Sequence, residues 1–245
     1  MNNLKNNGFT FKRFFVAHDQ CPMKVTTDSA ILGAWATIEH KPTNVLDIGT
    51  GCGIIALMLA QRLALCEPHI DAIDIDKSAV TQCQFNFDHS PFHNLHALCS
   101  DINDFVKQTN KKYDLIVTNP PYFETAIACR NEQRQKGRYT ENLNHHQLIT
   151  VVTSLLKVDG RFCLVLPSHL VDDFCSLAKK DGLKLNAKLD VIYNATKSAS
   201  LTLLCFSFFE TQNIETQTLC MRDLVNNYTN EFRSLLKDFY LFRKK

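Results

Sequence analysis

Four residues, Asn119-Pro120-Pro121-Tyr122, combine groups that could hold a flat amine. They follow the apolar run 113–118, which is predicted to be a buried strand ending in a tight turn. Two successive prolines stiffen the backbone and donate no N–H, so a carboxamide, backbone carbonyls and an aromatic ring remain in fixed positions. The carbonyl oxygens could accept from two amine N–H groups while the ring stacks on the ligand. These residues alone also fit a simple proline turn capped by an aromatic side chain.

A glycine-rich turn after the predicted strand 44–48 is the second candidate site. Glycines alternate at Gly49, Gly51 and Gly53, so the backbone could take positive φ and approach a ligand at the next helix N-terminus. Dinucleotide-binding turns have a different spacing, Gly-x-Gly-x-x-Gly. Asp47 would repel a pyrophosphate but would suit the sulfonium and ammonium of S-adenosylmethionine. A turn that only lets the helix pack is the competing interpretation.

Two more carboxylates lie where the next strands should end. Asp74 could accept from both hydroxyls of a ribose, and Asp101 could accept from an adenine amino group. Asp76 is an alternative to Asp74 but better fits the N-cap of the following helix. Ligands of open α/β sheets bind at the carboxyl ends of the strands, so three carboxylates there favour a nucleoside-containing cofactor. The predicted cofactor contacts are Asp47, Gly49, Gly51, Gly53, Asp74, Ile75, Asp101 and Ile102.

Short apolar strands alternating with amphipathic helices would position these residues. Strands are expected at 44–48, 69–75, 95–99, 113–118 and 161–166, and helices at 54–65, 78–88, 145–156 and 169–180. Such alternation predicts parallel strands with crossover helices. Two late strands, 185–192 and 201–209, have a short polar link and should be antiparallel. We therefore expect an α/β fold with a doubly wound, mostly parallel, seven-stranded sheet and an antiparallel edge strand.

The composition fits one globular domain. The chain has 245 residues, 45% hydrophobic, with a net charge of +2 that neither requires nor excludes a nucleic-acid partner. We expect an N-terminal extension over 1–43 with a helix at 31–38, a core over 44–210 and a helical tail over 211–245. Ten cysteines without Cys-x-x-Cys or zinc-ligand spacing predict a reducing compartment and no metal. No apolar signal core or membrane-length stretch is present, so a cytoplasmic protein is expected. The sequence does not reveal the oligomeric state, and a monomer is slightly favoured.

The chain resembles a known family over nearly its whole length. The glycine turn with Asp47, the acidic strand ends and the 119–122 motif are similar to class I S-adenosylmethionine-dependent methyltransferases. Members of that class modify adenine N6, guanine N2 or the glutamine amide of release factors. The segments 9–35, 138–140 and 237–241 resemble the bacterial tRNA(Val) adenine-N6 methyltransferases, which act on adenine 37. Gly137 departs from the alanine expected there.

The resemblance implies S-adenosylmethionine as methyl donor and tRNA as partner. Asn119 and the Pro120 carbonyl would hold the target nitrogen, and Tyr122 would stack on a flipped adenine. Thr27 and Asp28 would lie over the cofactor, although an ordinary helix N-cap also explains this segment.

Basic residues near the motif and near the N-terminus are the predicted RNA contacts. They are Arg130, Arg134, Lys136, Arg138, Lys12 and Arg13. The last two are interleaved with phenylalanines over 9–15 and form a second candidate RNA-binding surface. A solvated charged face is the competing interpretation of each group.

Other functions remain open at this stage. A protein glutamine N5-methyltransferase or an rRNA guanine-N2 methyltransferase would use a similar motif. Only about 43 residues precede the first core strand, too few for the helical domain that the glutamine enzymes carry. The glycine spacing and Asp47 argue against an NAD-dependent oxidoreductase. A catalytically silent RNA-binding module is the non-enzyme alternative.

Overall fold

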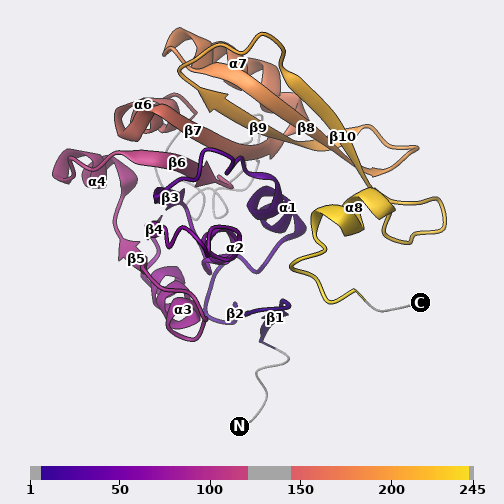
Figure 1. The fold of residues 1–245 in the computed structure, drawn as a ribbon, viewed down its shortest axis with the longest axis horizontal. Helices are drawn as coiled ribbons and strands as arrows, with labels where there is room; N and C mark the ends of the chain where they lie inside the picture. The colour runs from indigo at the N-terminus through magenta and orange to yellow at the C-terminus, as the bar shows by residue number, and fades with distance from the viewer. Residues whose placement is uncertain (1–6, 121–144, 243–245) are drawn as a thin grey trace, which may run out of the picture.

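The computed structural model describes residues 7–120 and 145–242. Within them the main sheet has eight strands in the order β10-β8-β9-β7-β6-β3-β4-β5, and β1 pairs with β2 separately (Figure 1). The strands are β1 Gly8–Thr10, β2 Phe15–Ala17, β3 Asn44–Ile48, β4 His69–Asp74, β5 Leu95–Cys99, β6 Tyr113–Thr118, β7 Leu156–Pro167, β8 Lys184–Asn194, β9 Ala199–Ser207 and β10 Glu215–Arg222. The helices are α1 Thr27–Trp35, α2 Ile54–Arg62, α3 Lys77–Asp88, α4 Ile102–Gln108, α6 His145–Leu155, the 3₁₀ helix η2 Ser168–Leu170, α7 Val171–Lys180 and α8 Asn230–Leu235.

Helices cover both faces of the sheet. Leu115 and Ile116 are neighbours on β6 and fully buried, yet they belong to two different apolar clusters because successive side chains point to opposite faces. One cluster packs under α1, α2, α3 and α8, and the other under α4, α6 and α7 (Figure 1). Burial on both faces is typical of a doubly wound parallel sheet. The predicted α/β fold class is confirmed.

One side of the sheet differs in detail from the prediction. The expected antiparallel pair is present, but β9 runs antiparallel to both β7 and β8 and therefore lies inside the sheet. β10 then adds parallel to β8, so the described sheet has eight strands instead of seven. Residues 215–222 were expected in a helical tail. The first four of them are exposed, so this edge strand lacks the apolar alternation that identifies a half-buried strand.

Helix α1 is fixed against α2. It begins at Thr27, earlier than the expected 31–38, because Thr26 is the N-cap and accepts from the Ser29 N–H at 3.3 Å. At its other end, the Arg62 guanidinium donates to the carbonyls of Gly33 at 3.1 Å and Ala36 at 2.7 Å. Arg62 therefore satisfies carbonyls that the helix end would otherwise leave without partners.

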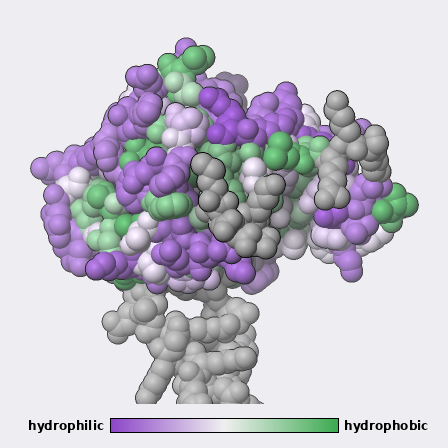
Figure 2. Space-filling view, turned by 90° about the horizontal axis from the view of Figure 1, so that it is seen from below, coloured by the Kyte–Doolittle hydropathy of each residue, from purple (hydrophilic) through white to green (hydrophobic). Residues whose placement is uncertain are grey.

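The hydropathy of the surface and of the helices is that of an ordinary globular protein. The face in Figure 2 is mostly hydrophilic, with hydrophobic residues in separate patches, as on ordinary globular proteins. Among the residues that the structure describes, no helix combines the length and apolarity needed to cross a membrane.

Candidate active site

Strand register brings the predicted cofactor and amine residues to one edge of the sheet. Ile48 of β3 lies opposite Ile73 of β4 and Thr118 of β6, and Asp74 of β4 lies opposite Cys99 of β5. The residues that follow these positions therefore leave the sheet at the same edge. Because ligands of open α/β sheets bind there, the fold gathers the glycine turn, the acidic strand ends and Asn119 around one candidate site.

Asp74 holds the glycine turn in place. Its carboxylate accepts from the backbone N–H groups of Gly51 and Asp76, both at 2.9 Å, and the Gly49 N–H donates to the Ile73 carbonyl at 2.8 Å. Asp74 thus has a structural role that the sequence did not reveal, beside the predicted ribose contact. Asp76 caps α3 by accepting from the N–H groups of Ser78 and Ala79, which confirms that prediction.

The three glycines of the turn have different structural roles. All have positive φ, at 69°, 55° and 83° for Gly49, Gly51 and Gly53. A Cβ on Gly49 would meet no described atom within 4 Å, and one on Gly51 would meet only the Cys21 sulfur at 3.7 Å. A Cβ on Gly53 would lie 2.7 Å from the Cys83 sulfur and 2.8 Å from the Phe87 ring. Gly49 and Gly51 therefore border open space where a ligand could lie, whereas Gly53 lets the turn pack on α3.

Gly53→Ala is expected to destabilise the protein by about 2–4 kcal/mol, because it combines backbone strain with overpacking. Gly49→Ala meets only the strain at positive φ and is the matched control, with a loss of about 1 kcal/mol. Urea unfolding of both variants measures the difference. Equal losses of stability in the two variants would contradict the packing role of Gly53.

Asp47 is a fully buried carboxylate at the end of β3. Its Oδ2 accepts from the Thr50 hydroxyl at 2.7 Å, but its Oδ1 is buried without a hydrogen-bond partner in the described residues. Burial raises the pKa of Asp47 to about 7, although the Thr50 hydroxyl and the Ala56 N–H lower it. An orphaned buried carboxylate oxygen is costly, so its presence beside a glycine turn indicates a site for a hydrogen-bonding or cationic ligand group.

Asn119 follows β6 and is half-buried. Its side-chain Nδ2 donates to the Ser29 hydroxyl of α1 at 2.9 Å, and the preceding Thr118 hydroxyl donates to the Ile48 carbonyl at 2.8 Å. These contacts tie the motif to α1 and β3. Pro120 is buried. The predicted stacking residue Tyr122 lies outside the described residues.

The remaining predicted cofactor residues differ in their exposure and in the groups that could contact a ligand. Asp101 is the N-cap of α4, and its Oδ1 accepts from the Asn103 backbone N–H at 2.8 Å. Ile75 is 55% exposed and could contact an adenine ring, whereas Ile102 is 7% exposed and packs into the core, so any ligand contact would come from its backbone. Thr27 and Asp28 form the first turn of α1, whose Ser29 contacts Asn119.

Asn86 of α3 is a positioning contact that sequence reasoning missed. This buried side chain donates to the carbonyls of Ala17 and Cys52, both at 2.8 Å, and accepts from the Ala17 N–H at 2.9 Å. Cys52 belongs to the glycine turn, so Asn86 joins that turn to β2. A polar residue on a helix gives no sequence signal for contacts this remote along the chain.

The predicted RNA contacts are only partly described. Lys12 and Arg13 are exposed, but Phe11 and Phe14 are 2% and 6% exposed. Phe11 packs against Phe14 and Tyr240, with ring centroids 4.7 and 5.8 Å away. Phe11 and Phe14 are therefore core residues and not part of an exposed RNA-binding surface. Arg130, Arg134, Lys136 and Arg138 lie outside the described residues.

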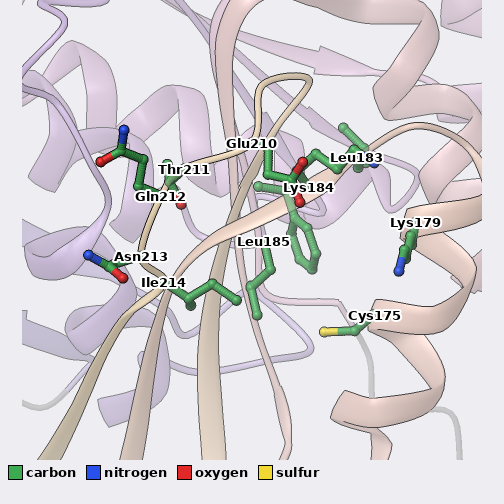
Figure 3. Close-up of a pocket in the computed structure, with 11 residues that line it drawn as sticks. Cys175, Lys179, Leu183, Lys184, Leu185, Glu210, Thr211, Gln212, Asn213 and Ile214 are labelled. Atoms are coloured by element: carbon green, nitrogen blue, oxygen red, sulfur yellow. The ribbon is translucent and has the colours of Figure 1, made fainter.

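A separate hollow lies between α7 and the loop after β9 (Figure 3). It has a volume of about 480 Å³, and Cys175, Lys179 and Ile214 are among its lining residues. None of the predicted site residues lines it. Within the described ranges, no group of three or more His, Cys, Asp or Glu side chains could hold a metal ion.

Solved structures share this fold. A predicted O-methyltransferase from Agrobacterium tumefaciens superposes with a TM-score of 0.64 at 12% identity, covering 86% of this chain and 96% of its own. A ribosomal protein L11 methylase from Lactobacillus delbrueckii gives a TM-score of 0.52 at 20% identity, covering 74% of this chain and 77% of its own. At such low identity the likeness establishes the fold alone, which is that of methyltransferases.

Sequence comparison goes further. Residues 25–180 match the sequence model of the methyltransferase small domain family. A protein of Photorhabdus laumondii is 43% identical over 98% of this chain and 97% of its own length, and one of Proteus mirabilis is 43% identical over 98% and 96%. Both carry the name tRNA1(Val) (adenine(37)-N6)-methyltransferase. The chain therefore belongs to the methyltransferase small domain family and, within it, to the family of these relatives.

Proposed function

We propose that this protein transfers a methyl group from S-adenosylmethionine to N6 of an adenine in tRNA, and that the adenine is nucleotide 37 of tRNA1(Val). The observation that carries the proposal is the placement of Asn119 at the same sheet edge as the buried Asp47 carboxylate and the glycine turn. The names of relatives covering almost the whole chain support the substrate. Because the substrate is tRNA, we place the reaction in the cytoplasm.

The residues present fit S-adenosylmethionine. The orphaned Oδ1 of Asp47 would attract the cationic amino acid end, and the open space beside Gly49 and Gly51 suits close backbone approach. Asp74 and Asp101, the predicted ribose and adenine contacts, both place their carboxylate at the same edge of the sheet. When bound, S-adenosylmethionine supplies a methyl group made electrophilic by its sulfonium.

Asn119 would act on the target amine. The lone pair of adenine N6 is delocalised into the ring, so the nitrogen must become more tetrahedral to attack. The Asn119 Oδ1 and the Pro120 carbonyl oxygen would accept hydrogen bonds from the two N–H groups of this nitrogen. These hydrogen bonds would favour both the tetrahedral geometry and the positive charge that develops. Tyr122 would stack on the flipped adenine. The proton can leave after methyl transfer, so this arrangement requires no strong general base.

The basic segment after the motif would hold tRNA. Arg134→Glu combined with Arg138→Glu is expected to weaken tRNA binding at least tenfold and to flatten its dependence on salt, because fewer phosphate contacts release fewer counterions. The matched control is Lys179→Glu with Lys184→Glu, which makes the same charge change beside the separate hollow. Filter binding over a salt series measures both. Wild-type affinity and salt slope in the arginine variant would refute this placement.

The function itself is tested by mass spectrometry of nucleosides. Deletion of the gene should remove N6-methyladenosine from one mapped tRNA position, and the purified protein should restore it with S-adenosylmethionine. An unchanged tRNA profile with altered release-factor methylation would favour a glutamine methyltransferase, and loss of N2-methylguanosine from rRNA would favour a guanine enzyme. Binding of tRNA without methyl transfer would leave only an RNA-binding module.

A further inference from the structure

We propose that Ser29 is a positioning residue that orients the Asn119 side-chain amide for methyl transfer. The inference rests on the proposed function, in which Asn119 Oδ1 accepts from the target amine. The Asn119 Nδ2 donates to the Ser29 Oγ at 2.9 Å. Since the amide group is planar, anchoring its nitrogen also determines the direction in which Oδ1 points.

Ser29 is a rigid anchor. It is 8% exposed, and its Oγ also accepts from the Thr26 hydroxyl at 3.1 Å, while its N–H donates to the Thr26 Oγ1 at 3.3 Å. The helix that carries it is held at its far end by Arg62. A Cβ on Gly33 would lie 2.9 Å from Met58, so α1 packs on α2 with little room to shift.

The residue type at this position favours the positioning role over simple capping. Ser29 occupies the third position of α1, where Glu or Gln would complete a capping box with Thr26. A serine hydroxyl is too short to bridge back in that way, and here it accepts from Asn119, 90 residues further along the chain. Without this bond the amide could rotate or flip, and part of the population would present Nδ2 instead of Oδ1 to the amine.

Ser29→Ala is expected to lower kcat about five- to tenfold, the effect of one lost hydrogen bond, with the KM for tRNA and the Kd for S-adenosylmethionine within twofold of wild type. In an Asn119→Ala background the same change should have no further effect, because Ser29 acts through Asn119. Ser207→Ala is the matched control. It removes another buried serine hydroxyl, at the end of β9, that donates to the Phe209 carbonyl, and kcat should not change.

A second readout does not depend on activity. Hydrogen exchange of the Asn119 side-chain amide, followed by ¹⁵N NMR, should accelerate in Ser29→Ala and stay unchanged in Ser207→Ala. Wild-type kcat and exchange in Ser29→Ala would overturn the inference while leaving the proposed function intact. An equal loss of kcat in both backgrounds would also overturn it, because the serine would then act only through stability. If Asn119→Ala itself keeps the wild-type kcat, the proposed mechanism fails and the inference fails with it.

Discussion

Replacing Asn119 with alanine is expected to lower kcat about 100- to 1000-fold, the usual effect of removing one preorganised group that stabilises developing charge. The KM for tRNA should change less than threefold, because the amide contact strengthens as the amine becomes more tetrahedral and acquires charge. The Kd for S-adenosylmethionine should stay near the wild-type value, since Asp47 and the glycine turn are untouched. Single-turnover transfer of labelled methyl groups to unmodified tRNA separates these quantities.

The control for this variant is Asn186→Ala. Asn186 also uses its side-chain Nδ2 to donate to an oxygen, the Phe209 carbonyl at 3.0 Å, but it lies on β8, near the start of the strand. Its loss should leave kcat unchanged. A rise in KM with wild-type kcat in Asn119→Ala would mean that the amide binds the ground state and transition state equally, contrary to the proposed mechanism.

The central strands and the site edge could be predicted because both depend on local patterns. The runs that became β3, β4, β5 and β6 are apolar and short. Each connection between them is long enough to contain the crossover helix that parallel strands require. Parallel strands place their carboxyl ends at one edge, so Asp74 and Asn119 had to converge once the strands were recognised. The N-cap role of Asp76 follows from an equally local pattern.

Contacts between distant segments could not be predicted in this way. The Phe11 and Phe14 side chains were expected within a candidate RNA-binding surface, but Tyr240, from the other end of the chain, packs against Phe11 and both rings are buried. β10 forms because β8 offers it an edge, not because its own residues alternate. The Ser29 and Asn86 hydrogen bonds each join residues remote in sequence. A single sequence carries no signal for such pairs.

The affinity for S-adenosylmethionine is expected to rise as the pH increases from 6 to 8. Burial raises the pKa of Asp47 to about 7, so much of the free protein carries a neutral carboxyl at pH 6 and a carboxylate at pH 8. The ammonium of the ligand favours the carboxylate, and binding below pH 7 should therefore release a proton. Calorimetric titration in buffers of different ionisation enthalpy measures both the Kd for S-adenosylmethionine and the number of protons released on binding. The control ligand is 5′-methylthioadenosine, which lacks the ammonium and should bind with little dependence on pH.

Asp47→Asn should separate binding from stability. At pH 8 it should weaken S-adenosylmethionine binding at least tenfold. The difference in Kd between the variant and wild type should become smaller below pH 7, where the wild-type carboxyl is itself increasingly neutral.

The same substitution should have the opposite effect on stability and make the folded protein more stable relative to wild type as the pH rises. The folded-state pKa lies above the ordinary value of 3.8, so wild type loses roughly 4 kcal/mol at this site as pH rises from about 4 to 7. The asparagine variant has no such loss, and the difference between the two unfolding free energies should shift in its favour over that range. A pH-independent difference would mean that Asp47 is already ionised in the free protein, with a partner that offsets its burial.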